Sequence, residues 1–196
     1  MATEIEAKVR IADPAGVERR LAELGAEYCG AWLQADTFFD HPDRALMKQD
    51  SALRLRVNRP LDKTAAARGE STELTYKGAR QAGRLKVRPE HQVGVPDAAA
   101  MTAILHGLDF SEALCYEKRR RKWRLGDADV AVDEVPRLGW FVEIEASTEA
   151  EVDRLLDQLG FVGRPRITES YVRLFATELA IGYDGHCIRF ECPPSA

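Results

Sequence analysis

Residues 4–11 read Glu-Ile-Glu-Ala-Lys-Val-Arg-Ile, and charged and apolar side chains alternate along the whole stretch. This repeat of two residues is typical of a β-strand, whose successive side chains point to opposite faces of a sheet. One face of the strand therefore carries Glu4, Glu6, Lys8 and Arg10, and the other face is apolar. A single strand of this kind is usual in a half-buried sheet with one solvated face.

The same alternation recurs along the chain and predicts eight strands. They span roughly 3–11, 34–40, 52–59, 72–78, 84–94, 115–125, 129–135 and 140–147. Their charged faces carry both signs of charge, at Arg54, Arg56, Lys77, Arg88, Glu90, Lys118, Arg120, Asp133, Glu143 and Glu145. Turn residues at 126–127 and 136–139 predict that the last three strands form an antiparallel meander.

Four amphipathic segments predict helices. Suitable N-cap residues at 13, 97, 148 and 168 place these helices at about 14–25, at 98–106, from 148 to 160 and from 168 onward. The first and third helices each follow a strand and stop at Leu-Gly, a short internal echo that hints at pseudo-symmetry. The segment 60–71 is expected to be a mobile loop.

Together these patterns predict an α+β fold. Helices can cover the apolar strand faces, so the mixed charges of the other faces are expected to line the interior of an eight-stranded antiparallel closed β-barrel. The length of 196 residues fits a single domain, with a core of about 1–180 and a tail, 181–196, to which no role is assigned.

Composition restricts the binding partners, the cellular location and the cysteine chemistry that can be expected. The chain has 28 Lys and Arg against 32 Asp and Glu, a formal net charge of −4, so any basic site must be local. The charged amino terminus and the absence of a long apolar run from the sequence predict a cytoplasmic protein without membrane attachment. The four cysteines form no CxxC pair and are expected to be reduced thiols.

The charged interior indicates a chemistry. Crowded Lys and Arg side chains repel one another and lose hydration, and a polyanion such as a triphosphate would compensate both costs. Acids beside that anion are explained if Mg²⁺ or Mn²⁺ bridges carboxylate and phosphate oxygens. The candidate metal ligands are Glu4, Glu6, Glu90, Asp133, Glu143 and Glu145.

The ordered motifs resemble the CYTH superfamily, the triphosphate tunnel metalloenzymes, and in particular its class IV adenylyl cyclase and thiamine triphosphatase branch. The resemblance begins at the ExExK of residues 4–8. It continues through QADTFFDHPDRAL, LRLR at 53–56, LTYKG at 74–78, KVRPE at 86–90, EKRRRKW at 117–123, VDEV at 132–135, GWFVEIE at 139–145 and ESYVRLF at 169–175.

The resemblance implies residue roles. Lys8, Arg54, Arg56, Lys77, Arg88, Lys118 and Arg120 match positions that bind the triphosphate. Glu4, Glu6, Glu143 and Glu145 match acidic, metal-associated positions, with Asp133 and Glu90 as further members. Glu4, Glu6 and Lys8 are the expected catalytic residues, with Lys8 as a phosphate clamp or as the base that activates water. Where many relatives have E-x-E after KVR, this chain has Gln92 in place of the second acid.

Several activities fit this pattern. A class IV adenylyl cyclase converts ATP to cyclic AMP and pyrophosphate, whereas a triphosphatase hydrolyses tripolyphosphate, thiamine triphosphate or a nucleoside triphosphate in the same tunnel. A non-catalytic polyphosphate or nucleotide binding module is the third alternative. Nucleic-acid binding by the run Lys118–Arg124 is disfavoured because alternate residues of a strand point to opposite faces. A homodimer is left open.

Overall fold

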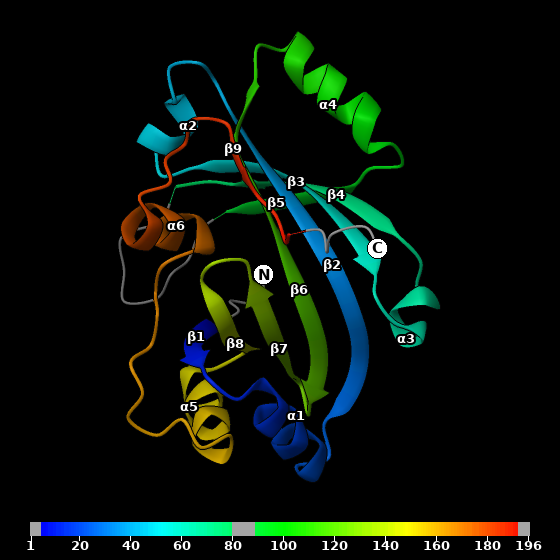
Figure 1. Cartoon of the computed structure of the whole chain (residues 1–196), viewed down its shortest axis with the longest axis vertical. Helices are drawn as coiled ribbons and strands as arrows, with labels where there is room; N and C mark the ends of the chain where they lie inside the picture. The colour runs from blue at the N-terminus through cyan, green and yellow to red at the C-terminus, as the bar shows by residue number, and fades with distance from the viewer. Residues whose placement is uncertain (1–4, 80–88, 192–196) are drawn as a thin grey trace. The chain divides into compact units, whose positions relative to one another are not determined.

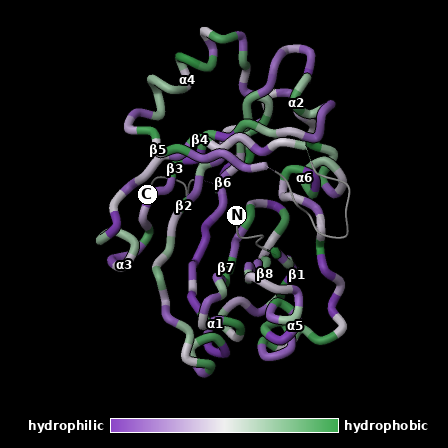
Figure 2. The backbone as a smooth tube through the Cα atoms, turned by 180° about the vertical axis from the view of Figure 1, so that it is seen from behind, coloured by the Kyte–Doolittle hydropathy of each residue, from purple (hydrophilic) through white to green (hydrophobic). Residues whose placement is uncertain are grey.

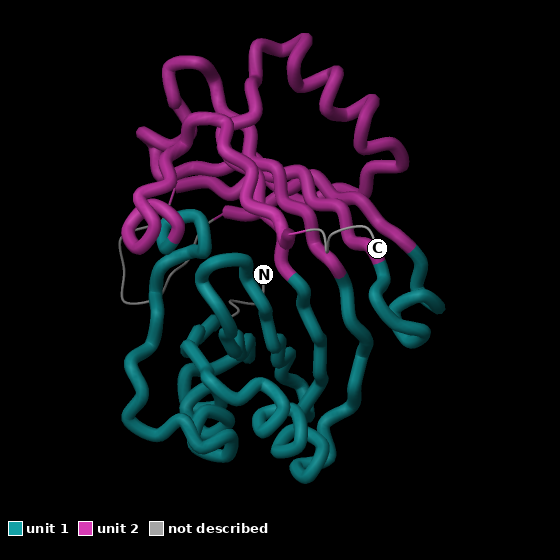
Figure 3. The backbone as a smooth tube through the Cα atoms, viewed as in Figure 1, with its two compact units in different colours: residues 1–32, 60–69, 119–174 teal, residues 33–59, 70–118, 175–196 magenta. Residues whose placement is uncertain are grey.

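The computed structural model describes residues 5–79 and 89–191. Glu4, Arg88 and the beginning of the strand expected at 84–94 lie outside the described residues. The chain divides into two compact units, each assembled from three separate segments (Figure 3). Unit 1 comprises residues 1–32, 60–69 and 119–174, and unit 2 comprises residues 33–59, 70–118 and 175–196.

The strands form a sheet in the order β1-β8-β7-β6-β2-β3-β4-β5. Their bounds are β1 Ile5–Ile11, β2 Glu27–Asp40, β3 Ala52–Pro60, β4 Ser71–Lys77, β5 Glu90–Gly94, β6 Ser111–Leu125, β7 Ala128–Val135 and β8 Gly139–Ala146 (Figure 1). The pairs β1·β8, β8·β7, β7·β6, β3·β4 and β4·β5 are antiparallel. The eight-stranded antiparallel sheet with helices is thus confirmed. Within the described residues, the hydrogen-bonded path has two ends, at β1 and at β5.

The helices are α1 Pro14–Glu23, α2 Ala45–Lys48, α3 Lys63–Ala66, α4 Ala98–Gly107, α5 Glu149–Gln158 and α6 Tyr171–Leu179. Three expected N-caps are confirmed: the side chains of Asp13, Asp97 and Thr148 accept hydrogen bonds from backbone N–H groups of the first turn. The fourth cap was predicted wrongly at residue 168. The helix begins at Tyr171, and the Ser170 hydroxyl accepts from the backbone N–H of residue 173 at 3.3 Å.

In unit 1, helices α1 and α5 cover one face of strands β1, β7 and β8. Their buried aliphatic side chains, such as Leu21 and Leu155, join Val9, Val132 and Val142 in one cluster. Burying a side chain of this size stabilises the fold by about 1.5–3 kcal/mol. This packing confirms that helices cover the apolar faces here and leaves the opposite, charged face for the site.

The two similar strand–helix segments, β1–α1 and β8–α5, both lie in this unit. Strand β1 pairs with β8, and the helix that follows each strand packs into the same cluster. In unit 2, the hydrophobic cluster of Phe39, Leu53, Leu55 and Leu105 includes a side chain of α4. Figure 2 shows the hydrophilic run along β6, a strand that passes through both units.

The segment 60–71 differs from the expected loop. It contains α3, whose cap Asp62 accepts from the backbone N–H of Ala65 at 2.8 Å and from the Tyr28 hydroxyl at 2.6 Å. Ala65 is fully buried. The backbone of Gly30, at φ +121°, passes so close that a Cβ there would lie 2.9 Å from the Ala65 nitrogen. The helix is therefore tied to unit 1 through contacts distant in sequence.

The cysteine prediction was wrong for one pair, because Cys115 and Cys187 form a disulfide across 72 residues. A short strand, β9 His186–Ile188, pairs in parallel with β6 and places these two residues opposite each other. Spacing along the chain could not reveal that register. Cys29 is a buried free thiol. Residues 186–188 thus add a strand to the sheet, in a segment for which no role was expected. Across residues 5–79 and 89–191, no helix is both long and apolar enough to cross a membrane.

Candidate functional site

The charged face of unit 1 is organised by strand register. Lys8 of β1 lies opposite Glu143 of β8, and Glu6 lies opposite Glu145. The Lys8 ammonium is 3.2 Å from Oε1 of Glu143 and 3.8 Å from Oε1 of Glu6, and it donates to the backbone carbonyl of Glu169 at 3.0 Å. Lys8 is only 4% exposed. Its ammonium is consequently held in one position by groups from three parts of the chain.

Arg120 of β6 contacts both Glu143, the partner of Lys8, and Asp133 of β7. Its guanidinium donates two hydrogen bonds to Asp133, at 2.7 and 2.5 Å, and also contacts Glu143. Burial disfavours the charge on Arg120, but the two carboxylates outweigh burial and raise the pKa of the guanidinium well above its ordinary value. Paired bonds of this kind fix orientation as well as charge. Lys8, Arg120, Asp133 and Glu143 therefore form one ion network, called here the unit 1 cluster.

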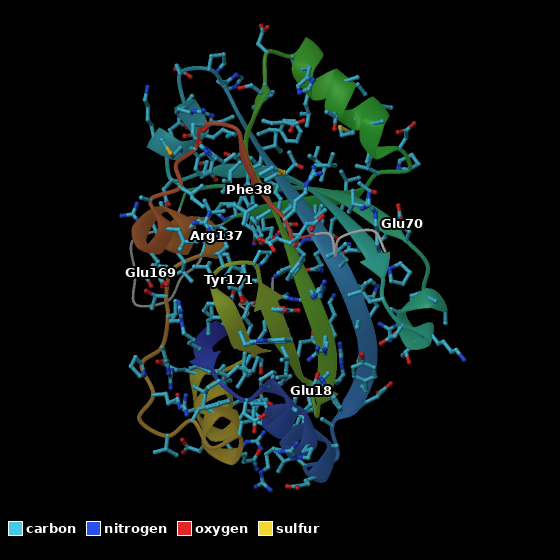
Figure 4. All side chains as sticks on the ribbon, in the orientation of Figure 1. Glu18, Phe38, Glu70, Arg137, Glu169 and Tyr171 are labelled. Atoms are coloured by element: carbon cyan, nitrogen blue, oxygen red, sulfur yellow. A yellow bond between two sulfur atoms is a disulfide. The ribbon has the colours of Figure 1, made fainter. Side chains whose placement is uncertain are left out.

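Tyr171, at the start of α6, completes the unit 1 cluster and was not among the predicted site residues (Figure 4). Its hydroxyl donates to Oδ2 of Asp133 at 2.9 Å, and its ring centroid is 4.2 Å from the Lys8 nitrogen. Burial, together with the charges of Asp133 and Glu143, raises the pKa of the Tyr171 hydroxyl well above its usual value. Tyr171 belongs to the motif ESYVRLF, but only the fold shows that it contacts Asp133 and Lys8.

Carboxylates at the edge of the unit 1 cluster suit a divalent cation. Glu6 and Glu145 lie directly opposite each other, and the Glu6 side chain is 55% exposed. Like charges in this arrangement destabilise a strand pair unless a cation compensates them. Oxygen donors of this type are the ligands that Mg²⁺ and Mn²⁺ prefer. In the described part of the chain, no three acids, histidines or cysteines gather as a ready metal cluster; Glu4 is outside it.

A second charged group, called the unit 2 cluster, lies on β2, β3 and β4. Arg56 donates two hydrogen bonds to Asp36, at 2.6 and 2.7 Å, and Arg54 lies 3.6 Å from Glu73 and donates to Thr75 at 3.3 Å. Asp36 and Glu73 were not predicted as site residues. Their positions in the alternating strands were the available signal, because Asp36 shares a face with Gln34 and Glu73 with Thr75.

Electrostatics in the unit 2 cluster favour anion binding. Burial alone would raise the pKa of Asp36, but Arg56 and Arg54 overcome that effect and hold it well below its ordinary value. Burial and the neighbouring charge of Arg56 lower the pKa of Arg54. Lys118, 3% exposed, adds a further positive charge that acts on Asp36. Arg54 and Arg56 therefore share the two acids Asp36 and Glu73, and Lys118 adds a further cation beside Asp36.

Other predicted residues are placed differently. Lys77 and Glu90 lie opposite each other on β4 and β5 of unit 2 and form a 2.9 Å salt bridge. Glu90 belongs to unit 2, whereas Glu6, Asp133, Glu143 and Glu145 belong to unit 1. Gln92, which replaces an acid, donates to Glu73 at 3.1 Å and lies within 3.4 Å of the Thr75 hydroxyl. This amide therefore belongs to the unit 2 cluster as a neutral partner.

The basic run of β6 divides between the two faces of the strand, as its alternation predicts. Arg119 forms a 3.0 Å salt bridge with Glu134, and Arg121 forms a 3.2 Å salt bridge with Glu18 of α1. Arg120, between them, points to the opposite face, where it belongs to the unit 1 cluster. The run therefore does not present a continuous basic surface.

Comparison with known proteins identifies the family of the chain. The CYTH domain model matches residues 2–165. A Methanocaldococcus jannaschii protein named "Putative adenylate cyclase" is 31% identical over 158 residues, which cover 80% of this chain and 85% of that protein. A solved Pyrococcus horikoshii structure is similar with a TM-score of 0.72 and 28% identity, over 89% of this chain and 99% of that one.

A third relative shares the fold at lower identity. It is a Hippeastrum protein, described as a "putative adenylyl cyclase" that "reveals a dominant" triphosphatase activity, with a TM-score of 0.62 and 20% identity, over 89% of this chain and 96% of that one. At that identity the likeness shows only the fold. The family model, in contrast, spans most of the sequence, from residue 2 to residue 165. The chain therefore belongs to the CYTH family.

Proposed function

We propose that this protein is a divalent-metal-dependent enzyme that acts on a triphosphate and converts ATP to cyclic AMP and pyrophosphate. The observation that supports this proposal most strongly is the unit 1 cluster. There Lys8 and Arg120 are held by the half-buried Glu143 and the buried Asp133, while the opposed carboxylates of Glu6 and Glu145 stay accessible. A protein that only bound an anion would not need the exposed carboxylates of Glu6 and Glu145 beside these cations.

The chain's own cations have the simplest role. Arg54, Arg56 and Lys118 of the unit 2 cluster supply the positive charge that attracts phosphate oxygens, and Lys77 and Arg88 are proposed to assist them. Guanidinium groups suit this role because their planar donors match phosphate oxygens in pairs. Asp36 and Glu73 keep the arginine side chains in place before substrate arrives. Such preorganisation reduces the cost of ordering on binding.

The unit 1 cluster supplies positioning for the reaction. Lys8 is proposed to bind phosphate oxygens as their charge increases, with its ammonium oriented by Glu143, by the Glu169 carbonyl and by the Tyr171 ring. Arg120, oriented by Asp133, adds a second cation at that place. Donors fixed in advance at a site of developing charge are the main source of catalysis in phosphoryl transfer.

A divalent cation, Mg²⁺ or Mn²⁺, held by Glu6, Glu143 and Glu145 would supply further neutralisation of the phosphate charge. Glu4 alternates onto the same face as Glu6 in the sequence and is proposed as an additional ligand. Asp133 contributes indirectly in this proposal, because it is fully buried and bonded to Arg120 and Tyr171.

The cyclase proposal follows the name of the 31%-identical relative. In that reaction the ribose 3′-hydroxyl attacks the α-phosphate, and pyrophosphate leaves. The second candidate is a triphosphatase, the activity described for the Hippeastrum protein, in which water attacks the terminal phosphate instead. Both reactions are proposed to use the same cations, and they differ in the nucleophile and in the phosphate that it attacks.

Product analysis tests the proposal. The purified protein is incubated with ATP, thiamine triphosphate and tripolyphosphate, each with Mg²⁺ or Mn²⁺, beside a Glu6→Gln, Glu143→Gln variant. Cyclic AMP and pyrophosphate from ATP, lost in the variant, is the expected result. Orthophosphate that is lost in the variant instead identifies a triphosphatase. Binding without any product overturns the enzymatic proposal and leaves the binding module.

A further inference from the structure

A chain of neutral polar side chains lies beside the unit 2 cluster and has no part in the proposed function. Gln34 of β2 donates to Oδ1 of Asn58 at 2.7 Å, and Asn58 donates to the Ser71 hydroxyl at 3.2 Å. Gln34 is 1% exposed and Asn58 is 8% exposed. These three residues are called the amide row; Gln34 and Asn58 bring uncharged hydrogen-bonding groups into a buried part of the sheet, and Ser71 is the exposed end of the row.

The amide row occupies a defined place relative to the charged residues. Asn58 lies opposite Ser71, and two residues along the same strands Arg56 lies opposite Glu73. Two residues of a strand span about 7 Å, and alternate residues point to the same face. The amide row therefore directly follows the row that carries Arg56, on the same face of unit 2.

Two buried atoms on this face have no hydrogen-bond partner among the described residues. One is the Gln34 carbonyl oxygen Oε1, and the other is Nε of Arg54, four residues from Asn58 along β3. The first atom accepts a hydrogen bond and the second donates one. Leaving a buried polar group unpaired costs on the order of 1–3 kcal/mol, so each atom favours a ligand that satisfies it.

The two atoms select for different ligand chemistry. A phosphate oxygen accepts the hydrogen bond that Arg54 offers, but an ionised phosphate has no hydrogen to give to Gln34. A hydroxyl or amino group can donate to Gln34, and the neutral amide row has no net charge to attract a phosphate. A ligand that satisfies both atoms carries phosphates at one end and an O–H or N–H group at the other.

We infer that the amide row is a subsite for the uncharged, hydrogen-bond-donating part of the substrate, and that Gln34 selects a nucleoside triphosphate over bare tripolyphosphate. This inference rests on the proposed function, since it concerns the substrate of the same reaction. It assigns the phosphates to the arginines of the unit 2 cluster and a hydroxyl or amino group of the nucleoside to Gln34.

Binding measurements on a Gln34→Leu variant test the inference. Dissociation constants for the α,β-methylene analogue of ATP, which cannot release pyrophosphate, and for tripolyphosphate are measured by calorimetry with Mg²⁺. The loss of one hydrogen bond is expected to weaken nucleotide binding about 3- to 10-fold. Tripolyphosphate binding should change less than about 2-fold, because its phosphates contact only charged residues.

Controls separate this role from a structural one. Ser71→Ala removes the far end of the amide row without touching the Gln34 oxygen, so it should leave the ratio of the two constants unchanged. If Gln34→Leu lowers the melting temperature below the assay range, Gln34→Met, with an unbranched side chain, takes its place.

The outcomes distinguish the two proposals. Equal weakening of both ligands, or of neither, overturns the nucleoside subsite and leaves the triphosphate enzyme intact. If the wild-type protein binds neither ligand, the proposed function itself fails.

Discussion

The contact between Tyr171 and the unit 1 cluster gives the sharpest prediction. Tyr171→Phe removes the hydroxyl that donates to Asp133 at 2.9 Å and keeps the ring 4.2 Å from the Lys8 nitrogen. Asp133 is fully buried, and it retains two hydrogen bonds from Arg120. A hydrogen bond to a charged group contributes about 1.5–3 kcal/mol, so the free energy of unfolding should fall by about that amount.

Activity should fall as well if the hydroxyl positions Asp133 and Arg120. A displacement of these groups that costs about 1.4–2.8 kcal/mol in the transition state lowers kcat about 10- to 100-fold. KM should change little, because the phosphate-attracting arginines of unit 2 are untouched. Steady-state kinetics of ATP turnover, with chemical denaturation of the same samples, measures both quantities.

Tyr28→Phe is the matched control. Tyr28 also donates its hydroxyl to an aspartate, Asp62 at 2.6 Å, and it also belongs to unit 1, but it ties down α3. This variant should lose stability while its kcat stays within about 2-fold of wild type. If both variants lose stability and neither loses kcat, Tyr171 only holds the fold together and the reasoning about positioning is refuted.

The remaining predictions concern acid stability, metal binding and packing. The pKa of Asp36 is lowered in the folded protein, so the stabilising contribution of Asp36 is complete above the unfolded pKa of about 3.9 and is lost as pH falls below it. In Asp36→Asn, the curve of unfolding free energy against pH should therefore be flatter below about pH 4. An unchanged curve would contradict the Arg56–Asp36 pairing. Glu6→Gln with Glu145→Gln should weaken Mn²⁺ binding at least about 10-fold by calorimetry, while an unchanged affinity would remove these acids from the metal site. Gly30→Ala should destabilise the protein by about 1–3 kcal/mol in thermal unfolding, since the backbone has φ +121° and faces α3; full stability would show that this approach is not tight.

Local periodicity determined much of this protein from the sequence alone. Alternation in residues 4–11 and 52–59 assigned Lys8 and Arg56 to charged faces because a strand places every second side chain on the same side. N-cap residues such as Asp13 and Thr148 located helices because their side chains bond the first turn, an interaction within a few residues. These effects act over short distances along the chain, so sequence order contains them.

Only the tertiary structure decided which of these side chains meet. The register that sets Lys8 against Glu143 joins residues far apart in sequence, and nothing local specifies it. The same applies to Tyr171 beneath Lys8 and to the disulfide between Cys115 and Cys187, which depends on the pairing of β9 with β6. The charge of a side chain and the strand face on which it lies are properties of local sequence. Its interaction partners, its burial and its pKa arise when distant segments pack together.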